Sequence, residues 1–185
     1  MRKARHARSV RAESGAGNEG SVGQAVGPLS SPGDLAYAIP PRIIEAREAG
    51  ERVVFTNGCF DLLHPGHVSY LRAARSLGDA LVVGLNSDAS VSRLKGPLRP
   101  IVSERDRAVM LCALEVIDAV VIFTEDTPER LLRELKPAVY VKGGDYRIQD
   151  LPEAQIAAKI GAEVRILPFE PGYSTTALIE KIKNL

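Results

Sequence analysis

The sequence predicts an α/β protein: a single doubly wound, Rossmann-like domain built on a five-stranded parallel sheet. Short runs rich in Val, Ile and Leu alternate along the chain with segments that have helical spacing of apolar residues. The apolar runs show little alternation of polar and apolar residues, which is typical of strands covered by helices on both faces. Strands joined through helices favour a parallel sheet, because each connection has to return to the same edge.

The elements follow one another from about residue 40. A first helix is expected over residues 41–49, because Gly50 is a natural helix terminator. The expected strands cover residues 52–56, 80–86, 119–124, 138–142 and 163–169. Helices should fill the gaps between these strands, and the helix after the first strand should end at Gly78.

Two further helix starts can be recognised from local residue patterns. Ser103 followed by Asp106 has the form of a capping box, and the next residues, 108–116, are apolar on one side. Thr127 is expected to cap another helix, with Pro128 in its first turn.

The composition is that of an ordinary globular protein. The 185 residues are 45% hydrophobic and 25% charged, and the net charge is +1. This length supports a substantial core, and such a small net charge predicts no attraction to nucleic acid or membranes. No apolar run approaches the length of a spanning helix. Cys59 and Cys112 lack metal or redox spacing, which favours a reducing, cytoplasmic location.

Residues 1–33 differ from the remainder of the chain. They are rich in basic residues, Gly, Ser and Ala, and they contain no aromatic residue. Such a segment buries too little apolar surface to fold, and no apolar signal-peptide segment follows the basic residues. We expect residues 1–33 to be a disordered, functionally silent basic extension, with a nucleic-acid-binding arm as the alternative. Residues 34–185 should form the folded domain.

Residues 56–67 carry the strongest functional signal, Thr-Asn-Gly-Cys-Phe-Asp-Leu-Leu-His-Pro-Gly-His, directly after an apolar strand. Pro65 suits the first position of a helix, and Gly66 lets a phosphate approach the backbone. His64 and His67 are three residues apart and share a helix face. Imidazole donors at a helix N-terminus suit an anionic phosphate, so a nucleotide is the first ligand to consider.

Two other interpretations of the histidines remain open at this point. They could be ordinary polar residues of a surface helix. They could also bind zinc together with Cys59 or Asp61, since imidazole, thiolate and carboxylate are all zinc ligands. The intervening Pro and Gly suit an anion better than a closed tetrahedral shell.

Polar clusters follow four of the expected strands. After the histidine segment come Asn86-Ser87-Asp88, then Lys142-Gly143-Gly144-Asp145-Tyr146, and finally Ser174-Thr175-Thr176. Each cluster alone could be a local turn or helix cap. Because the carboxyl ends of parallel strands meet at one edge of a sheet, the clusters together predict one site.

The sequence resembles the nucleotidyltransferase superfamily that carries a His-x-Gly-His motif and a Ser/Thr-rich motif near the C-terminus. It is more closely similar to the D-glycero-β-D-manno-heptose 1-phosphate adenylyltransferase family, over about residues 40–185. The segments that carry this similarity are residues 55–61, 85–90, 93–96, 141–146 and 172–176. The resemblance implies attack of a sugar 1-phosphate on the α-phosphate of ATP, which releases pyrophosphate and forms an ADP-heptose.

The same resemblance implies roles for individual residues. The expected catalytic residues are His64 and His67 on the triphosphate, Lys95 in a mobile loop after the second strand, and Lys142 as a second point charge. The expected nucleotide-binding residues are Thr56, Asn57, Gly58, Phe60, Gly66, Asn86, Asp88, Ser174, Thr175 and Thr176. The expected substrate-binding residues are Asp61, Arg99, Arg107, Gly144 and Asp145. Mg²⁺ is expected as cofactor, bound through the ATP phosphates rather than by protein side chains.

The chain departs from its relatives in three ways. Many relatives are fused to a sugar kinase, which the short N-terminal extension cannot supply, so a separate upstream kinase is expected. Glycerol phosphate cytidylyltransferases carry Arg-Thr-x-Gly before the Ser/Thr motif, whereas residues 169–172 read Phe-Glu-Pro-Gly. Tyr173 replaces a small or Cys residue. A homodimer is expected by family analogy alone.

Two competing functions stay open. One is a related nucleotidyltransferase with another acceptor or base, such as glycerol 3-phosphate with CTP, or a flavin phosphate with ATP as in FAD synthetases. The other is a nucleotide-binding regulator that has lost turnover. The presence of both histidines, both lysines and the Ser/Thr motif favours an enzyme.

Overall fold

A six-stranded parallel sheet organises the part of the chain that the computed structural model describes, which is residues 34–145, 147–168, 170 and 172–185. The strand order is β1-β4-β3-β2-β5-β6. The strands are β1 (Asp34–Ala36), β2 (Val53–Gly58), β3 (Ala80–Asn86), β4 (Ala119–Phe123), β5 (Val139–Gly143) and β6 (Glu163–Leu167). The helices are α1 (Pro41–Glu48), α2 (Pro65–Arg75), α3 (Asp88–Lys95), α4 (Glu104–Cys112), α5 (Glu129–Leu135), the 3₁₀ turn η1 (Ile148–Asp150), α6 (Ala154–Lys159) and α7 (Thr175–Lys183).

The predicted α/β class and all five predicted strands are confirmed, but the sheet has one strand more than predicted. This strand, β1, pairs in parallel with the first three residues of β4 at the edge of the sheet. It is only three residues long, too short to show a pattern of strand residues. The predicted disordered extension, residues 1–33, lies outside the described residues.

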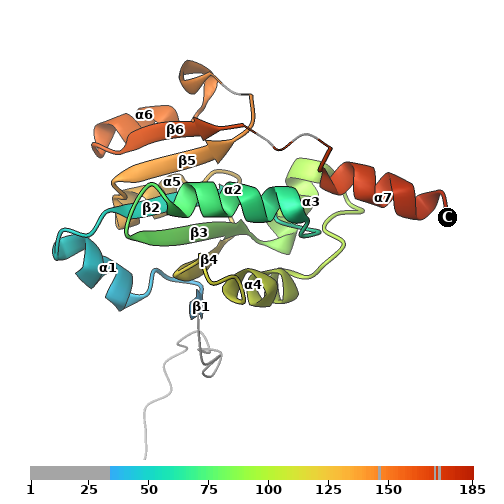
Figure 1. Ribbon diagram of the computed structural model, residues 1–185, viewed down its shortest axis with the longest axis horizontal. Helices are drawn as coiled ribbons and strands as arrows, with labels where there is room; N and C mark the ends of the chain where they lie inside the picture. The colour runs from blue at the N-terminus through green and yellow to red at the C-terminus, as the bar shows by residue number, and fades with distance from the viewer. Residues whose placement is uncertain (1–33, 146, 169, 171) are drawn as a thin grey trace, which may run out of the picture.

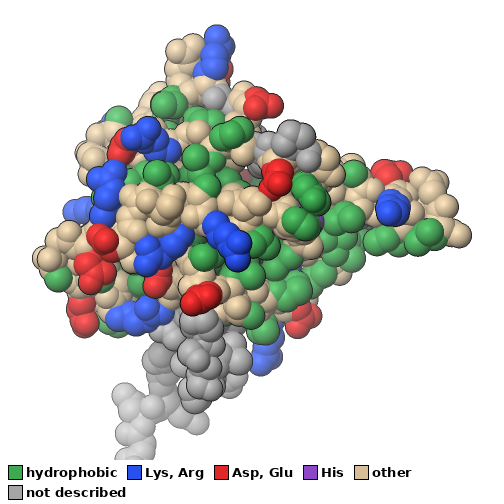
Figure 2. All heavy atoms as spheres, viewed as in Figure 1, with side chains coloured by type: hydrophobic (Ala, Val, Ile, Leu, Met, Phe, Trp, Pro, Cys, Tyr) green, Lys and Arg blue, Asp and Glu red, His purple; other side chains and the backbone are tan. Residues whose placement is uncertain are grey.

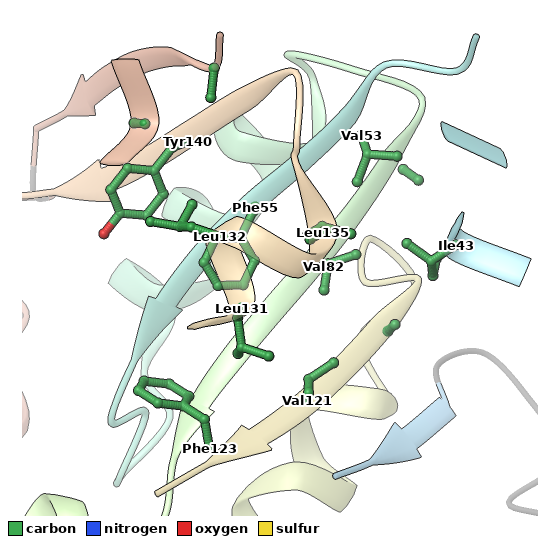
Figure 3. Close-up of a cluster of buried hydrophobic side chains, with 14 of the residues drawn as sticks. Ile43, Val53, Phe55, Val82, Val121, Phe123, Leu131, Leu132, Leu135 and Tyr140 are labelled. Carbon is green, nitrogen blue, oxygen red and sulfur yellow. The ribbon is translucent and has the colours of Figure 1, made fainter. Parts of the chain in front are cut away.

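Helices cover both faces of the sheet, which confirms the doubly wound arrangement (Figure 1). On one face α1, α5 and α6 pack against the sheet, and Figure 3 shows Ile43 of α1 and Leu132 of α5 approaching Phe55 and Val82. On the other face α2 and α4 pack against a second cluster of apolar side chains. Burying both faces explains why the strands read as continuous apolar runs.

The central strand β2 divides its side chains between these two cores. Val53 and Phe55 belong to the cluster under α1, α5 and α6, whereas Val54 belongs to the cluster under α2 and α4. Thr56 follows on the α2 side, where its hydroxyl lies 2.6 Å from the hydroxyl of Tyr70. Successive side chains of β2 point to opposite faces of the sheet, and this alternation determines the face on which each residue lies.

Most predictions about where helices begin and end agree with the structure, but those for Thr127 and Lys95 do not. His64 is the N-cap of α2 and Pro65 its first residue, as predicted. Thr127 is not a cap, because Pro128 occupies the N-cap position of α5 and no side chain caps that helix. Lys95 is not in a loop, because it is the last residue of α3, whose N-terminus Ser87 caps.

The other helices begin or end close to the predicted positions. Ser103 caps α4 by accepting the Asp106 N–H, although α4 ends at Cys112, short of residue 116. α1 ends at Glu48, just before Gly50, whose φ of 93° is the left-handed conformation that favours glycine.

The C-terminal helix α7 extends away from the sheet (Figure 1), and none of its residues is buried. Figure 2 shows hydrophobic side chains gathered near α7 on this side of the molecule, and the exposed apolar residues include Leu98, Tyr173 and Ile182. Among the described residues, no helix combines the length and apolar character needed to cross a bilayer.

Candidate active site

The start of helix α2 places the two histidines against each other. The Nδ1 atom of His64 accepts the backbone N–H of His67 at 3.3 Å, and the two imidazole rings stack with centroids 3.8 Å apart and an interplanar angle of 14°. Because Nδ1 of His64 acts as an acceptor, the proton of its neutral ring is on Nε2. The cap therefore orients His64 with one N–H still available as a donor.

His67 lies deeper than its neighbour. Its Nδ1 atom is buried and has no hydrogen-bond partner among the described residues, and its ring lies 5.2 Å from the ring of Phe60. Burial, together with the nearby His64, lowers the pKa of His67 to about 4, and burial also lowers the pKa of His64. Both rings are therefore neutral donors at pH 7 when no ligand is bound.

A second helix start meets the first. Ser174 is the N-cap of α7 and its Oγ accepts the Ala177 N–H at 3.0 Å, while the Thr175 hydroxyl donates to the Leu62 carbonyl at 3.4 Å. The Tyr173 ring lies nearly parallel to that of His64, with centroids 6.2 Å apart. The positive ends of the α2 and α7 dipoles thus converge on one place, a typical arrangement for binding an anion.

These helix starts open onto a cavity of about 550 Å³. Most of the predicted site residues line it: Asn57, Gly58, Phe60, Asp61, His64, Gly66, His67, Asn86, Lys95, Arg99, Lys142, Ser174, Thr175 and Thr176. The cavity lies at the carboxyl ends of β2, β3 and β5, and the structure therefore brings the predicted polar clusters together at one edge. Five predicted residues do not line it: Thr56, Asp88, Arg107, Gly144 and Asp145.

Arg107 braces the cavity wall from behind and is fully buried, with 0% exposure. Its guanidinium donates to the carbonyl oxygens of Cys59 at 2.5 Å, Asn86 at 2.9 Å and Val102 at 2.9 Å, and to a carboxylate oxygen of Asp88 at 2.6 Å. Arg107 and Asp88 therefore bind each other and the ends of β2 and β3. Both residues hold this wall, and their predicted ligand-binding roles stay predictions.

Asp61 also has protein partners where a substrate was expected. It accepts hydrogen bonds from Arg99 at 2.5 Å and from the backbone N–H groups of Ile101 at 2.8 Å and Val102 at 2.9 Å. Burial acts to raise the pKa of Asp61, but these donors outweigh it, and the net shift is downward. Its carboxylate ties the segment between α3 and α4 to the loop after β2.

The remaining predicted residues differ in their surroundings. Thr56 is buried and bound to Tyr70. Gly144 is buried and Asp145 is exposed, both just beyond β5. The predicted nucleotide-binding role of Thr56 and the substrate-binding roles of Gly144 and Asp145 stay predictions.

Several residues of the cavity or their partners were not predicted, and Tyr70, Tyr140 and Glu153 are the ones that bond to predicted residues. Lys142 donates to a Glu153 carboxylate oxygen at 3.1 Å and also approaches Tyr140. Tyr140 could have been found, because residues two apart in a strand share a face and Lys142 was already predicted. Glu153 gave no such signal, since the chain between Gly143 and α6 has no regular period.

The structure gives no support to the zinc alternative. Within residues 34–145, 147–168, 170 and 172–185, no three His, Cys, Asp or Glu side chains form a group that could hold a metal ion. Asp61 in particular is occupied by Arg99 and by backbone donors. The convergence of two helix starts at the histidines favours an anion such as phosphate.

Comparisons with known proteins identify the family to which this chain belongs. The sequence profile described as cytidylyltransferase-like matches residues 55–181, the stretch from β2 to α7. Over 156 residues the chain is 53% identical to the bifunctional protein HldE of Rhodopseudomonas palustris, covering 84% of this chain and 31% of that protein. It is 48% identical over 170 residues to the bifunctional protein HldE of Helicobacter pylori, covering 89% and 36% respectively. The chain thus spans about a third of the length of these relatives.

Two solved structures have the same fold. The lipopolysaccharide core biosynthesis protein of Thermoplasma volcanium superposes with a TM-score of 0.53 at 33% identity, covering 65% of this chain and 98% of that one. The pantoate-beta-alanine ligase of Francisella tularensis superposes with a TM-score of 0.53 at 14% identity, covering 78% and 70%, and supports the fold alone. These matches confirm the resemblance that the motifs carried. The chain belongs to the cytidylyltransferase-like family.

Proposed function

We propose that this chain is a nucleotidyltransferase that transfers the adenylyl group of ATP to D-glycero-β-D-manno-heptose 1-phosphate, giving ADP-heptose and pyrophosphate. One observation carries this proposal: the starts of α2 and α7 converge on a cavity where two stacked, neutral histidines offer hydrogen-bond donors. The similarity to HldE proteins and the motifs shared with heptose 1-phosphate adenylyltransferases support the choice of ATP and a heptose phosphate.

The reaction needs no nucleophile from the protein. A phosphate oxygen of the sugar 1-phosphate attacks the α-phosphorus of ATP, and the bond to the bridging oxygen of pyrophosphate breaks. The protein has to align the two anions and stabilise the charge that develops between them. His64, His67 and the backbone N–H groups at the starts of α2 and α7 supply donors for this purpose.

Positive charge for the phosphates comes from the α3 side of the cavity. Lys95 lines the cavity at the end of α3 and makes no hydrogen bond or ion pair within the described part of the chain. Arg99 lines it too, although Asp61 shares its charge. Lys95 is therefore the cation that can turn towards a triphosphate at least cost.

Mg²⁺ is proposed as the metal that accompanies ATP. The carboxylate of Asp61 is already occupied by protein donors, and Asp126, which also lines the cavity, accepts a hydrogen bond from Arg93. This surrounding suits an ion held by phosphate oxygens and water, as Mg²⁺ often is. When bound, Mg²⁺ would offset the negative charge of the phosphates.

The supply of the sugar 1-phosphate by a separate kinase stays a prediction; the HldE relatives, of which this chain spans about a third, are described as bifunctional. A cytoplasmic location and a homodimer stay predictions.

Pyrophosphate release, measured across nucleotides and acceptors, tests the proposal. ATP and CTP are each combined with heptose 1-phosphate, glycerol 3-phosphate and riboflavin 5′-phosphate. The pair ATP and heptose 1-phosphate should give the highest kcat/KM. Faster turnover of CTP with glycerol 3-phosphate would show that the proposed substrates are wrong. ATP binding without pyrophosphate release from any pair would indicate a regulator instead of an enzyme.

The role of His67 can be tested separately. His67→Asn should lower kcat by about 100-fold or more, the usual effect of removing one donor that stabilises transition-state charge. The Kd for ATP should change much less, because that interaction strengthens only as charge develops. An unchanged kcat in a folded variant would remove the role assigned to His67.

A further inference from the structure

Four polar side chains meet at the β5 end of the cavity. They come from three parts of the chain: Asn57 from β2, Tyr140 and Lys142 from β5, and Glu153 from the turn before α6. Asn57, Lys142 and Glu153 line the cavity, although Glu153 is only 6% exposed. A nearly buried carboxylate is unexpected in a pocket for phosphates, because like charges repel.

Lys142 has no donor left for a phosphate. Its ammonium group donates to Glu153 at 3.1 Å, to the Asn57 side-chain oxygen at 3.3 Å and to the Tyr140 hydroxyl oxygen at 3.4 Å. An ammonium group has three N–H donors, so these three acceptors use all of them. The charge of Lys142 is also offset by Glu153. This end of the cavity is therefore close to neutral, in contrast to the end at α2, α3 and α7.

Asn57 and Glu153 nevertheless keep hydrogen-bonding capacity. The Asn57 side-chain oxygen accepts from Tyr140 at 2.9 Å and from Lys142, whereas its amide nitrogen has no partner among the described residues. A carboxylate has about four acceptor positions, and Lys142 uses one of those on Glu153. The cluster thus offers a spare N–H donor beside a spare carboxylate acceptor.

That combination complements hydroxyl groups, because each hydroxyl both donates and accepts. We infer that Asn57 and Glu153 form a subsite that recognises the hydroxyl groups of a sugar ring, with Lys142 as the residue that positions the Glu153 carboxylate. The inference rests on the proposed function, since both the ribose of ATP and the heptose carry adjacent hydroxyls. Lys142 acts in this subsite through Glu153, and phosphate binding is left to the other end of the cavity.

Equilibrium binding of single ligands to the whole chain tests this inference and distinguishes the two sugars. Glu153→Gln keeps the size of the side chain but weakens its acceptor. If ribose is bound, wild type should bind ATP about tenfold or more tightly than 2′-deoxy-ATP or 3′-deoxy-ATP, and the variant should lose this preference. If the heptose is bound, the variant should bind heptose 1-phosphate about tenfold more weakly, with unchanged ATP binding.

Tripolyphosphate, which has no hydroxyl group on carbon, tests Lys142. The double variant Glu153→Gln, Lys142→Met removes both charges and leaves neither uncompensated. It should bind tripolyphosphate as tightly as wild type while losing the same sugar preference. A tenfold or larger loss of tripolyphosphate affinity would show that Lys142 grips phosphate and would overturn the inference.

Controls separate this inference from folding and from the proposed function. Glu51→Gln changes an exposed carboxylate that does not line the cavity and should leave all these affinities unchanged. Thermal melting confirms that each variant is folded. If Glu153→Gln changes neither the deoxynucleotide preference nor heptose phosphate binding, the inference is wrong even if wild type turns over. If wild type binds ATP with a Glu153-dependent preference but releases no pyrophosphate, only the proposed function fails.

Discussion

At the scale of single residues, Arg107 has the largest predicted effect on stability. Its fully buried guanidinium joins the ends of β2 and β3 to Asp88 at the start of α3. Arg107→Met leaves these acceptors without a donor, and each buried acceptor that is left unsatisfied costs about 1–3 kcal/mol. Urea unfolding should show this loss in the free energy of unfolding.

A neighbouring arginine on the same helix provides the control for Arg107. Arg105 is exposed on α4, so Arg105→Met should change the free energy of unfolding by less than about 0.5 kcal/mol. Equal effects of the two substitutions would mean that the buried contacts of Arg107 contribute nothing beyond the general loss of a charge.

His67 makes stability depend on pH. Its pKa falls from the ordinary 6.5 to about 4 on folding, so the unfolded chain binds its proton more readily than the folded chain. The stabilising effect of the neutral ring is complete above pH 6.5 and is lost as the pH falls towards 4. His67→Asn should therefore lose less stability than wild type between pH 7 and pH 5 in urea unfolding. An identical pH dependence of both proteins would show that His67 is not the titrating group.

At the scale of elements, the contact between the starts of α2 and α7 decides the shape of the phosphate end. A Cβ at position 66 would lie 2.9 Å from the Cβ of Tyr173 and 3.2 Å from Nδ1 of His64. Gly66→Ala should therefore separate the two helix starts and weaken ATP binding by about tenfold, which corresponds to about 1.4 kcal/mol. Isothermal titration measures this loss.

The second substitution Tyr173→Gly removes the nearest of the atoms that the new methyl group would meet. Adding it to Gly66→Ala should restore part of the ATP affinity, measured relative to Tyr173→Gly alone. If Gly66→Ala binds ATP as wild type does, close approach of the two helix starts is not required for binding.

The elements also show what sequence patterns can predict. The buried strands were predictable, because Val-, Ile- and Leu-rich runs have no other place in a chain of this length. From sequence alone Asn86-Ser87-Asp88 could be a turn or a helix cap, and Lys95 was expected in a loop; in the structure Ser87 accepts the Ser90 N–H and starts α3, which ends at Lys95. A residue type with two local uses cannot be assigned without its tertiary contacts.

The location of the candidate site was predictable, but the partners of its individual residues were not. Parallel strands place their carboxyl ends together, so Asn57, Asn86 and Lys142 could be placed at one edge from strand order alone. Which of them meets a ligand depends on partners that arrive from distant segments. Glu153 forms an ion pair with Lys142, and Arg107 forms one with Asp88. Neither contact has a signature in sequence spacing.

At the scale of the whole molecule, we expect the site to depend on the sheet rather than on residues 1–33. The cavity is lined by residues between Asn57 and Thr176, and β1 at the sheet edge contacts β4 rather than the cavity. A chain that begins at Asp34 should therefore keep the kcat/KM and the melting temperature of the full chain. A large loss of kcat/KM in this truncation would show that the basic extension takes part in catalysis.

A second truncation, which begins at Ala38, distinguishes the extension from the edge strand. It removes β1 and its parallel pairing with Ala119, Val120 and Val121, but it keeps Ile39, which packs against the core beside α1. Losing these backbone hydrogen bonds and the cover over the β4 edge should lower the melting temperature. The kcat/KM below that temperature should stay the same, because the ends of β2, β3 and β5 hold the cavity without β1. Equal melting temperatures for the two truncations would mean that β1 adds nothing to the stability of the sheet.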